Sequence, residues 1–546
     1  MIPSVRYEKF GEYSFPLSGN IGFYCDEDLI CDALAALTYL LPEAKFVFSE
    51  KDYCILAKYS EDLSFEEYSV LSKNGKIIIF YNSYLGLRNA LSAFSLTVKK
   101  EGELLIVPEY EIRDYPEASH RGVMLDVARG VMPLERLMAD IVLIAKARMN
   151  VLHLHLADSK GVAIELDSLP TEYRLEGYYT KSDVKKIVEL CRVLAVEIIP
   201  EFDMPAHSTL LNKMFKNIRC KTDLEYQSLW TVCPGSEDAY VLYDKIIDET
   251  VAMFPGGRYF HIGGDEIEFL DLAEKEKEPR ICHWEVCERC RKKMRDEGIR
   301  DRVELNYYFI NRINETVKSH GRRTVIWSDQ VDTTRDVGIS RDVLFHFWRI
   351  AGRGRGPHDG CSMQGQLDRG YELINSHYPN TYVDLEEYMS SKNLADWRWD
   401  ESPECREDSR DRIIGSEVCA WEYGNISEYP HYAYSLPSAI FLMADKLWSG
   451  EKRKFTVKDE IDLTRAVLGA LTPAGFNVFS ILGDIFPPRD NSLFYSEGIK
   501  ASEKEIKDAI ALLSREDIIM CAPSHSVKAY KACAEAALSF LKKSEE

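Results

Sequence analysis

The residues of this sequence best suited to chemistry are two adjacent acids, Asp265 and Glu266, in the segment HIGGDEIEF (261–269). A carboxyl group can protonate a leaving group or, when ionised, stabilise a developing positive charge. Neighbouring residues of an extended chain point in opposite directions, so these acids are badly placed to face each other across one bond. We therefore expect them to do different jobs. Gly263 and Gly264 are expected to leave space for a ligand to approach the backbone.

Alternating strands and helices, which must position these acids, begin at about residue 120. The expected strands are 122–127, 150–156, 196–202, 259–264, 323–329, 343–348, 380–385 and 415–421. Helical patterns separate them, for instance at 134–148 and 181–195. Eight such strands predict an α/β fold of the (β/α)8 TIM-barrel type, in which the chemistry lies at the carboxyl ends of the strands.

The barrel is predicted to span residues 118–450, between two further units. Residues 1–117 mix strand-like and helix-like runs, such as KIIIFY (76–81) and GLRNALSAFSLTV (86–98), and predict a small N-terminal α/β domain. Residues 451–546 have mostly helical spacing and predict a helical C-terminal segment.

The expected strand ends bring carboxylates and aromatic rings together. They carry Asp126, His155, Asp158, Glu201, Asp203, Asp265, Glu266, Trp327, Asp329, Trp348, Tyr382, Asp384 and Trp421. Aromatic faces that stack and carboxylates that accept hydroxyl protons suit a neutral, polyhydroxylated ring. Solvation of the strand ends would explain the acids but not the three tryptophans, so a sugar site is favoured.

The composition narrows the partners of the chain. Its 546 residues carry a formal net charge of −21, which argues against nucleic acid and anionic membranes as partners. No apolar run approaches the length of a membrane span, and the N-terminus lacks the pattern of a signal peptide. The 14 cysteines are then expected to be free thiols in a reducing cytoplasm. The sequence carries no signal of oligomeric state.

Seven segments, taken in order, resemble glycoside hydrolase family 20, the β-N-acetylhexosaminidases. They are HRGVMLDVARG (120–130), NVLHLHLADSKG (150–161), IIPEFDMPAHS (198–208), HIGGDEIEF (261–269), VIWSD (325–329), YVD (382–384) and GSEVCAW (415–421). The HxGGDE pattern is the most specific of them. The resemblance implies an exo-acting, retaining enzyme that removes terminal N-acetyl-β-D-glucosamine or galactosamine, with no cofactor and no metal.

The resemblance also implies the roles of ten residues. The nucleophile would be the carbonyl oxygen of the substrate's own 2-acetamido group, which attacks C1 and forms an oxazolinium ion. Glu266 would act as general acid and then base, Asp265 would orient the acetamido N–H, and Tyr382 would donate to its carbonyl oxygen. Substrate contacts would come from Arg121, Asp158, His207, Trp327, Trp348, Asp384 and Trp421.

One departure from the family pattern follows Trp421. The family often places a glutamate that binds O4 or O6 two residues after this tryptophan, whereas the order here is Trp421-Glu422-Tyr423. The preference between glucosamine and galactosamine, and the tolerance of a decorated O6, therefore stay open.

Two alternatives concern the class of protein. His153 and His155 share one strand face and could be the metal pair of an amidohydrolase barrel, although that pair usually lies on the first strand and this one is on the second. His207, His261 or Asp265 would complete such a site. A catalytically inactive sugar-binding protein is a further class, against which the intact acid pair argues.

The segment CHWEVCERC (282–290) raises a separate question about metals. It offers Cys282, His283, Cys287 and Cys290, a set that zinc could bind. Free cysteines packed in the loop and helix after the fourth strand are the favoured interpretation, with no catalytic role.

Overall fold

The computed structural model describes residues 3–102, 104–223, 225–267, 282–348, 361–384, 397–401, 405–425 and 432–450. Three isolated positions between 504 and 511 are described as well. The predicted C-terminal helical segment otherwise lies outside the described residues.

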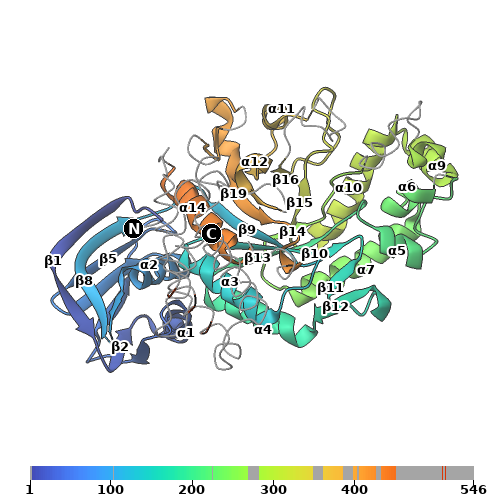
Figure 1. The fold of residues 1–546 in the computed structure, drawn as a ribbon. Helices are drawn as coiled ribbons and strands as arrows, with labels where there is room; N and C mark the ends of the chain where they lie inside the picture. The colour runs from blue at the N-terminus through green and yellow to red at the C-terminus, as the bar shows by residue number, and fades with distance from the viewer. Residues whose placement is uncertain are drawn as a thin grey trace, which may run out of the picture.

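Eight parallel strands close into the predicted barrel (Figure 1). In order around the ring they are β9 (His120–Asp126), β10 (Val151–Asp158), β13 (Glu197–Phe202), β14 (Tyr259–His261), β15 (Arg323–Trp327), β16 (Leu344–Phe347), β17 (Leu373–Asn375) and β19 (Ile413–Ala420). Residues 415–420 of β19 pair with residues 120–125 of β9, which closes the ring. All eight residues of β10 are buried, as expected for a parallel strand covered on both faces.

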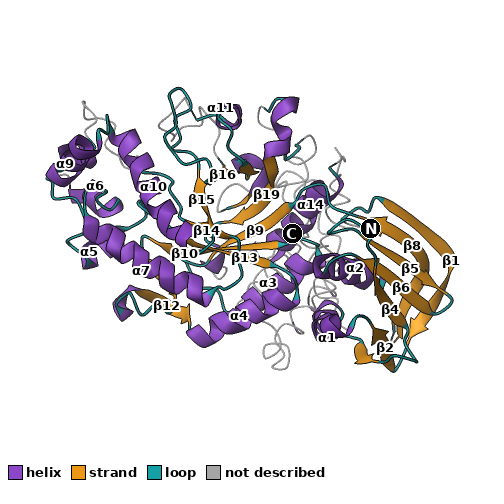
Figure 2. Cartoon of the chain, turned by 180° about the vertical axis from the view of Figure 1, so that it is seen from behind, coloured by secondary structure: helices purple, strands orange, loops and turns teal. Residues whose placement is uncertain are grey.

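Helices surround the barrel on its outer face (Figure 2). Those of the barrel and its loops are α3 (Leu134–Lys146), α4 (Lys181–Val193), α5 (Thr209–Met214), α6 (Glu225–Trp230), α7 (Glu237–Met253), α8 (His283–Val286), α9 (Glu288–Glu297), α10 (Arg302–Ser319), α11 (Met363–Asp368), α12 (Tyr378–Thr381) and α14 (Tyr432–Ser449). Two short strands, β11 (Gly161–Ile164) and β12 (Arg174–Tyr179), extend from β10. Among the described helices, none has the length and apolar character needed to cross a membrane.

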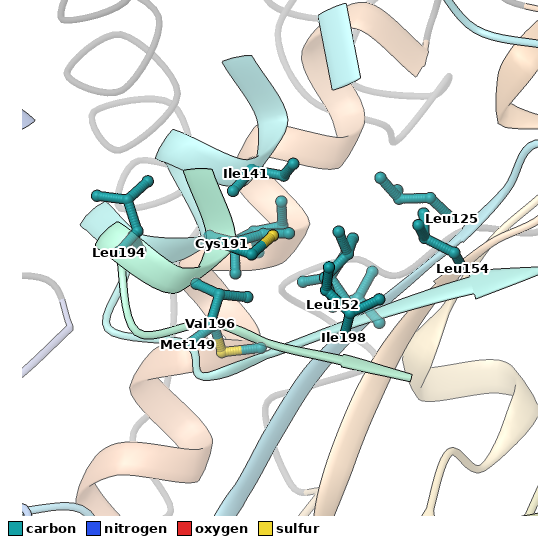
Figure 3. Packing of buried hydrophobic residues seen from close by; sticks show 14 of the residues in the cluster. Leu125, Ile141, Met149, Leu152, Leu154, Cys191, Leu194, Val196 and Ile198 are labelled. Carbon is teal, nitrogen blue, oxygen red and sulfur yellow. The ribbon is translucent and has the colours of Figure 1, made fainter. Parts of the chain in front are cut away.

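The sequence explains where some of these helices begin. Thr180 accepts a hydrogen bond from Asp183 N at the start of α4, and the Asp183 carboxylate accepts one from Thr180 N in return, which forms a capping box. The apolar faces of α3 and α4 pack on β9, β10 and β13. Figure 3 displays this packing, with Leu125, Ile141, Met149, Leu152, Leu154, Cys191, Leu194, Val196 and Ile198 labelled.

One predicted strand is misplaced. The seventh barrel strand is β17 at 373–375, not the expected run at 380–385. Residues 382–383 instead form the two-residue strand β18 (Tyr382–Val383), which pairs with Cys419 and Ala420 at the end of β19. Tyr382 therefore still reaches the carboxyl end of the barrel, although from an added strand.

The N-terminal domain is a mixed sheet with two helices. Its strands are β1 (Tyr7–Leu17), β2 (Asn20–Tyr24), β3 (Lys45–Phe48), β4 (Ile55–Tyr59), β5 (Tyr68–Lys73), β6 (Lys76–Tyr81), β7 (Lys99–Glu101) and β8 (Leu104–Asp114). Helices α1 (Ile30–Leu40) and α2 (Tyr84–Thr97) contact α3, and α1 also contacts α4. The strand expected at 76–81 and the helix expected at 86–98 are confirmed.

A buried ion pair joins the two units at the amino end of the barrel. Arg148 and Asp114, both fully buried, form a salt bridge, and Asp114 Oδ2 also accepts from the Tyr68 hydroxyl at 2.9 Å and from Trp448 Nε1 at 2.7 Å. The Arg148 guanidinium lies over the Trp448 ring at 4.3 Å. This buried, hydrogen-bonded pair helps to fix the orientation of one unit on the other.

Candidate active site

The acid pair follows a strand that is much shorter than expected. Strand β14 ends at His261, and Gly263, Gly264 and Glu266 all have positive φ, of 68°, 96° and 51°. Glycine suits the first two positions, since left-handed backbone strains other residues. A Cβ on Gly263 would lie 1.8 Å from Oδ1 of Asp203, so a carboxylate fills the space beside Gly263. The prediction that this glycine leaves room for a ligand is therefore wrong.

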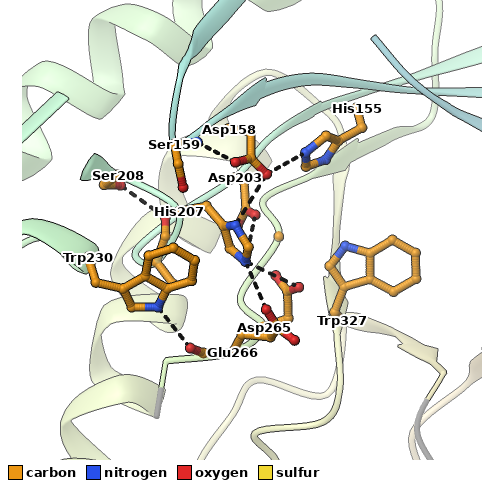
Figure 4. A network of polar contacts seen from close by, with 12 residues as sticks. His155, Asp158, Ser159, Asp203, His207, Ser208, Trp230, Asp265, Glu266 and Trp327 are labelled. Atoms are coloured by element: carbon orange, nitrogen blue, oxygen red, sulfur yellow. Dashed lines mark hydrogen bonds and ion pairs between the residues drawn. The ribbon is translucent and has the colours of Figure 1, made fainter. Parts of the chain in front are cut away.

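This turn brings the two acids together. Carboxylate oxygens of Asp265 and Glu266 lie 3.7 and 3.5 Å from Nε2 of His207 (Figure 4). The expectation that the acids point in opposite directions is therefore wrong, because it assumed an extended chain. The side chain of Asp265 is 10% exposed and that of Glu266 is 21% exposed, so Asp265 is the deeper of the two.

His207 is the cation at the centre of this acid cluster. Its Nδ1 lies 3.2 Å from Asp158 Oδ2, and its Nε2 lies 3.8 Å from Asp203. Although burial lowers it, the carboxylates of Asp203, Asp158 and Asp265 raise the pKa of His207 well above 6.5. A charged His207 thus offsets the mutual repulsion of the acids.

Asp265 has a perturbed pKa of its own. Burial, together with the charges of Asp203, Asp329 and Glu266, raises its pKa well above 3.8, while His207 opposes the rise. A carboxylate in this state gains most from a positive charge that develops beside it, which is typical of a functional site.

The arginine of the site is Arg129, not Arg121. Arg129 contacts Asp158 at 3.0 Å and Asp126 at 3.4 Å, and its guanidinium lies 4.7 Å from the centre of the Trp421 ring. Two backbone N–H groups, of Ala128 and Arg129, donate to Asp126 Oδ1 and fix the turn after β9.

Arg121 lies at the opposite end of β9. It is fully buried, donates to the carbonyls of Ala118 and Arg148, and forms a salt bridge with Glu66 of the N-terminal domain. The prediction that it binds substrate is wrong, because a residue at the amino end of a barrel strand cannot reach the site at the carboxyl end.

The predicted aromatic residues meet in one cluster, as expected. Trp327, Tyr382 and Trp421 pack together with Met124 and Cys419, and Trp348 packs against them. The Trp348 and Tyr382 rings are stacked at 6.0 Å, while Trp421 lies 6.2 Å from Tyr382 and 5.8 Å from Trp327. Such a wall can enclose the apolar face of a sugar and a small acyl group.

The Tyr382 hydroxyl is kept protonated, so it can donate a hydrogen bond. Burial first, and then Cys419, Asp265 and Asp384, raise the pKa of its phenol well above 10. The half-buried Asp384 directly follows β18, two residues after Tyr382, at the carboxyl end of the barrel.

A layer of buried histidines and glutamates supports the floor of the site. Glu201 accepts from Trp327 Nε1 at 2.8 Å and contacts His155 at 2.7 Å and His153 at 3.1 Å. His153 also contacts Glu417 at 2.9 Å. Both histidines proposed for an amidohydrolase metal pair are thus bonded to buried carboxylates, which lock the orientation of the strands beneath the aromatic wall.

Tyr423, which stands at the position of the family glutamate, does not take over its role. Tyr423 is fully buried, and its hydroxyl accepts a hydrogen bond from Arg136 of α3. Glu422 has a φ of 55° and donates its backbone N–H to Asp126 at 2.9 Å. The Tyr423 side chain therefore points toward α3 and away from the acid pair.

Three further residues of the site, Asp203, Asp329 and Trp230, were given no role from the sequence. Asp203 fills the space behind Gly263, and Asp329 accepts from Glu266 N at 3.2 Å and from Trp348 Nε1 at 3.3 Å. Trp230 donates to the Glu266 carbonyl at 3.0 Å and packs on the His207 ring at 4.5 Å. Both acids were visible as strand-end residues, whereas Trp230 is the last residue of the short helix α6 and no sequence pattern marks it.

A barrel whose carboxyl end combines an acid pair with an aromatic wall is the arrangement of a carbohydrate-active enzyme. A family model of the glycosyl hydrolase family 20 catalytic domain matches residues 119–451. The chain belongs to this family, which sets aside the amidohydrolase alternative.

Curated relatives are named β-hexosaminidases. That of Porphyromonas gingivalis is 26% identical over 408 residues, which is 68% of this chain and 49% of the relative. The β subunit of Rattus norvegicus is 25% identical over 405 residues, 70% of this chain and 69% of the relative. The match thus spans about half the length of the first.

Solved structures confirm the fold. A Vibrio harveyi GH20 exo-β-N-acetylglucosaminidase in complex with N-acetylglucosamine has a TM-score of 0.71 at 20% identity, covering 86% of this chain and 76% of that one. A mutant Streptomyces plicatus β-hexosaminidase in complex with its product, GlcNAc, has a TM-score of 0.67 at 20% identity, covering 86% of this chain and 95% of that one.

Proposed function

We propose that this protein is an exo-acting, retaining β-N-acetylhexosaminidase that removes terminal N-acetyl-β-D-glucosamine or galactosamine from glycans or short oligosaccharides. The observation that carries the proposal is the convergence of Asp265 and Glu266 on one atom, Nε2 of His207. Carboxylates on one turn cannot flank a glycosidic bond from opposite faces, as an ordinary glycosidase requires. The acetamido oxygen of the substrate then serves as the nucleophile.

The more exposed acid, Glu266, meets the leaving group. Its proton passes to the glycosidic oxygen as the acetamido carbonyl oxygen attacks C1 and the bond from C1 to the leaving oxygen breaks. Glu266 is then ionised and takes a proton from water, which attacks C1 and opens the oxazolinium ring. Two inversions at C1 give net retention.

Asp265 and Tyr382 hold the nucleophile in line. Asp265 accepts the acetamido N–H and, in its ionised form, which the His207 cation favours, offsets the positive charge of the oxazolinium ion. The Tyr382 phenol stays protonated and donates to the acetamido oxygen. An intramolecular nucleophile held in this way gains up to roughly 7–11 kcal/mol over a free one.

The remaining contacts orient the sugar ring. Trp327, Trp348 and Trp421 enclose the acetamido group and ring, and Arg129 with Asp158 binds ring hydroxyls. The substrate class is supported by relatives described as bound to N-acetylglucosamine. The expected cytoplasmic location favours short imported oligosaccharides over polymeric chitin.

Turnover and product analysis test this function. The protein should hydrolyse an aryl N-acetyl-β-glucosaminide and shorten N-acetylglucosamine oligosaccharides from one end, one residue at a time. Release of internal fragments would contradict exo action. Binding of the sugars without turnover would instead indicate the inactive sugar-binding class.

A further inference from the structure

Four cysteines from three segments meet beside the active site. Cys220, Cys233, Cys287 and Cys290 are all buried and free, and their sulfur atoms all lie within 4.8 Å of one another. Sulfur–sulfur distances are 3.4 Å for Cys233 to Cys290, 3.7 Å for Cys220 to Cys290 and 3.8 Å for Cys233 to Cys287. The first and last are 70 residues apart along the chain, so folding alone brings them together.

These distances match a tetrahedral metal site. Zinc bound by four thiolates has zinc–sulfur bonds of about 2.3 Å, which place neighbouring sulfurs about 3.8 Å apart at tetrahedral angles. Thiols that merely pack as small apolar groups have no reason to gather all four sulfurs around one point. Cys191 illustrates that simpler role, since it is buried among the aliphatic side chains of Figure 3.

The backbone is built to present the four sulfurs. Cys287 is the N-cap of α9, and the Cys-x-x-Cys spacing places Cys290 in its first turn. Cys220 and Cys233 flank the antiparallel bridge between Arg219 and Val232. The two pairs are pressed together at Gly235, where a Cβ would lie 2.5 Å from Cys290 N.

The four ligands differ from the set suggested by sequence. Cys282 and His283 do not join the cluster: His283 Nε2 lies 2.5 Å from the Thr231 hydroxyl, and Cys282 Sγ lies 3.9 Å from His283 Nδ1. Cys220 and Cys233, more than 50 residues upstream of Cys287, take their places.

We propose that Cys220, Cys233, Cys287 and Cys290 bind one zinc ion as a tetrathiolate structural site, in place of the free thiols predicted from sequence. Binding releases the thiol protons and gives a site of net charge −2. The cationic Arg289, between two of the ligands, donates to the carbonyls of Asn217 and Arg219 on the facing segment. The metal thus fastens the loop after β13 to the segment after β14.

This site would steady two groups of the active site. Trp230 precedes Cys233 by three residues, donates to the Glu266 carbonyl and packs on His207. Ser208 N donates to the Trp230 carbonyl, and Val232 N donates to the Pro205 carbonyl, so the cysteine-bearing segment is paired with the one that carries His207. Loss of zinc is expected to disturb these contacts before it unfolds the barrel.

Metal analysis of the full chain, purified under reducing conditions, tests the proposal. Wild type should contain one zinc per chain, released by titration with an organomercurial and detected with a chromogenic chelator. Cys287→Ser and Cys220→Ser should reduce zinc to background. The matched control is Cys282→Ser. Cys282 lies in the same apolar cluster but is not one of the four proposed ligands, so this variant should keep its zinc.

A second measurement covers variants that fail to fold. Wild type exchanged with Co²⁺ should display the visible bands and sulfur-to-cobalt charge-transfer absorption of a tetrahedral tetrathiolate. Zinc-free reduced wild type, iron in place of zinc, disulfides among these four cysteines, or equal zinc loss in Cys282→Ser would each overturn the assignment.

Discussion

Two arginines near the ends of strand β9 have opposite environments. Arg121, at the amino end, has a side chain that is 0% exposed and is bonded to Glu66 and to backbone carbonyls. Arg129, beyond the carboxyl end, is 23% exposed and lies between Asp126 and Asp158. The first is enclosed by protein partners, whereas the second is partly exposed at the carboxyl end of the barrel, so only the second is placed to bind a ligand.

The same contrast separates the two ends of the barrel. At the amino end, Arg148, Asp114, Tyr68 and Trp448 partner one another and join two units. At the carboxyl end, several acids share the cation His207, and burial raises the pKa of Asp265. Polar groups at one end stabilise the fold, and those at the other are kept ready for a substrate.

The largest expected effect is on activity. Glu266→Gln removes the general acid, so hydrolysis of a disaccharide with a poor leaving group should fall by roughly 10²–10⁴-fold. The loss should be much smaller for an aryl glycoside with a very good leaving group, which needs little protonation. Steady-state kinetics on both substrates check this, and a near wild-type rate on the disaccharide would remove Glu266 from the mechanism.

A substitution at the amino end of the barrel should lower the stability of the protein. Arg148→Met leaves the buried Asp114 carboxylate without its cation, and we expect a loss of about 3–5 kcal/mol in the free energy of unfolding. The matched control is Arg192→Met, which breaks an ion pair between α4 and Asp32 of α1 in which both side chains are partly exposed. That pair should contribute only about 0–1 kcal/mol. Equal losses in urea unfolding would contradict the contrast.

Measuring both kcat/KM and stability for variants of Arg121 and Arg129 sharpens the comparison. Arg129→Met should lower kcat/KM by about 10–100-fold, because it removes charge-assisted hydrogen bonds worth roughly 1.5–3 kcal/mol. Arg121→Met should lower the unfolding midpoint and leave kcat/KM near its wild-type value. If Arg121→Met impaired kcat/KM at unchanged stability, the original sequence prediction for Arg121 would be reinstated.

The smallest effect is a shift in the pH profile. The His207 cation lowers the pKa of Asp265, so His207→Asn should raise that pKa and move the acid limb of kcat/KM to higher pH. The control His320→Asn changes a partly exposed histidine paired with Asp248 and should leave the profile in place. An acid limb that stayed fixed or moved down in His207→Asn would show that this cation does not tune Asp265.

Much of the fold could be predicted, because its patterns are local. Buried parallel strands are short apolar runs between amphipathic helices, and the predicted barrel is confirmed. The misplaced seventh strand has a physical cause: β17 is only three residues long, while Tyr382–Val383 has a similar apolar character. Arg121 was wrongly chosen as the substrate-binding arginine because Arg121 and Arg129 occur in one motif. The sequence does not show which of them lies at the carboxyl end of β9.

Long-range convergence could not be predicted. No spacing links Cys220 and Cys233 to Cys287 and Cys290, and the positive φ of Glu266 that turns its carboxylate toward His207 has no sequence signature. Asp203 likewise lies behind Gly263 only because two neighbouring strands end together. The acid pair was recognisable from its own segment, but its geometry depended on the rest of the barrel.

The central claim is that the substrate supplies the nucleophile, and matched glycosides test it most directly. We predict rapid hydrolysis of an aryl N-acetyl-β-glucosaminide and almost no turnover of the aryl β-glucoside with a 2-hydroxyl group. NMR should detect the β-anomer first, and a thiazoline that mimics the oxazoline should bind far more tightly than the substrate. Equal rates on the two sugars, or an inverted first product, would contradict the account and require a second carboxylate as nucleophile.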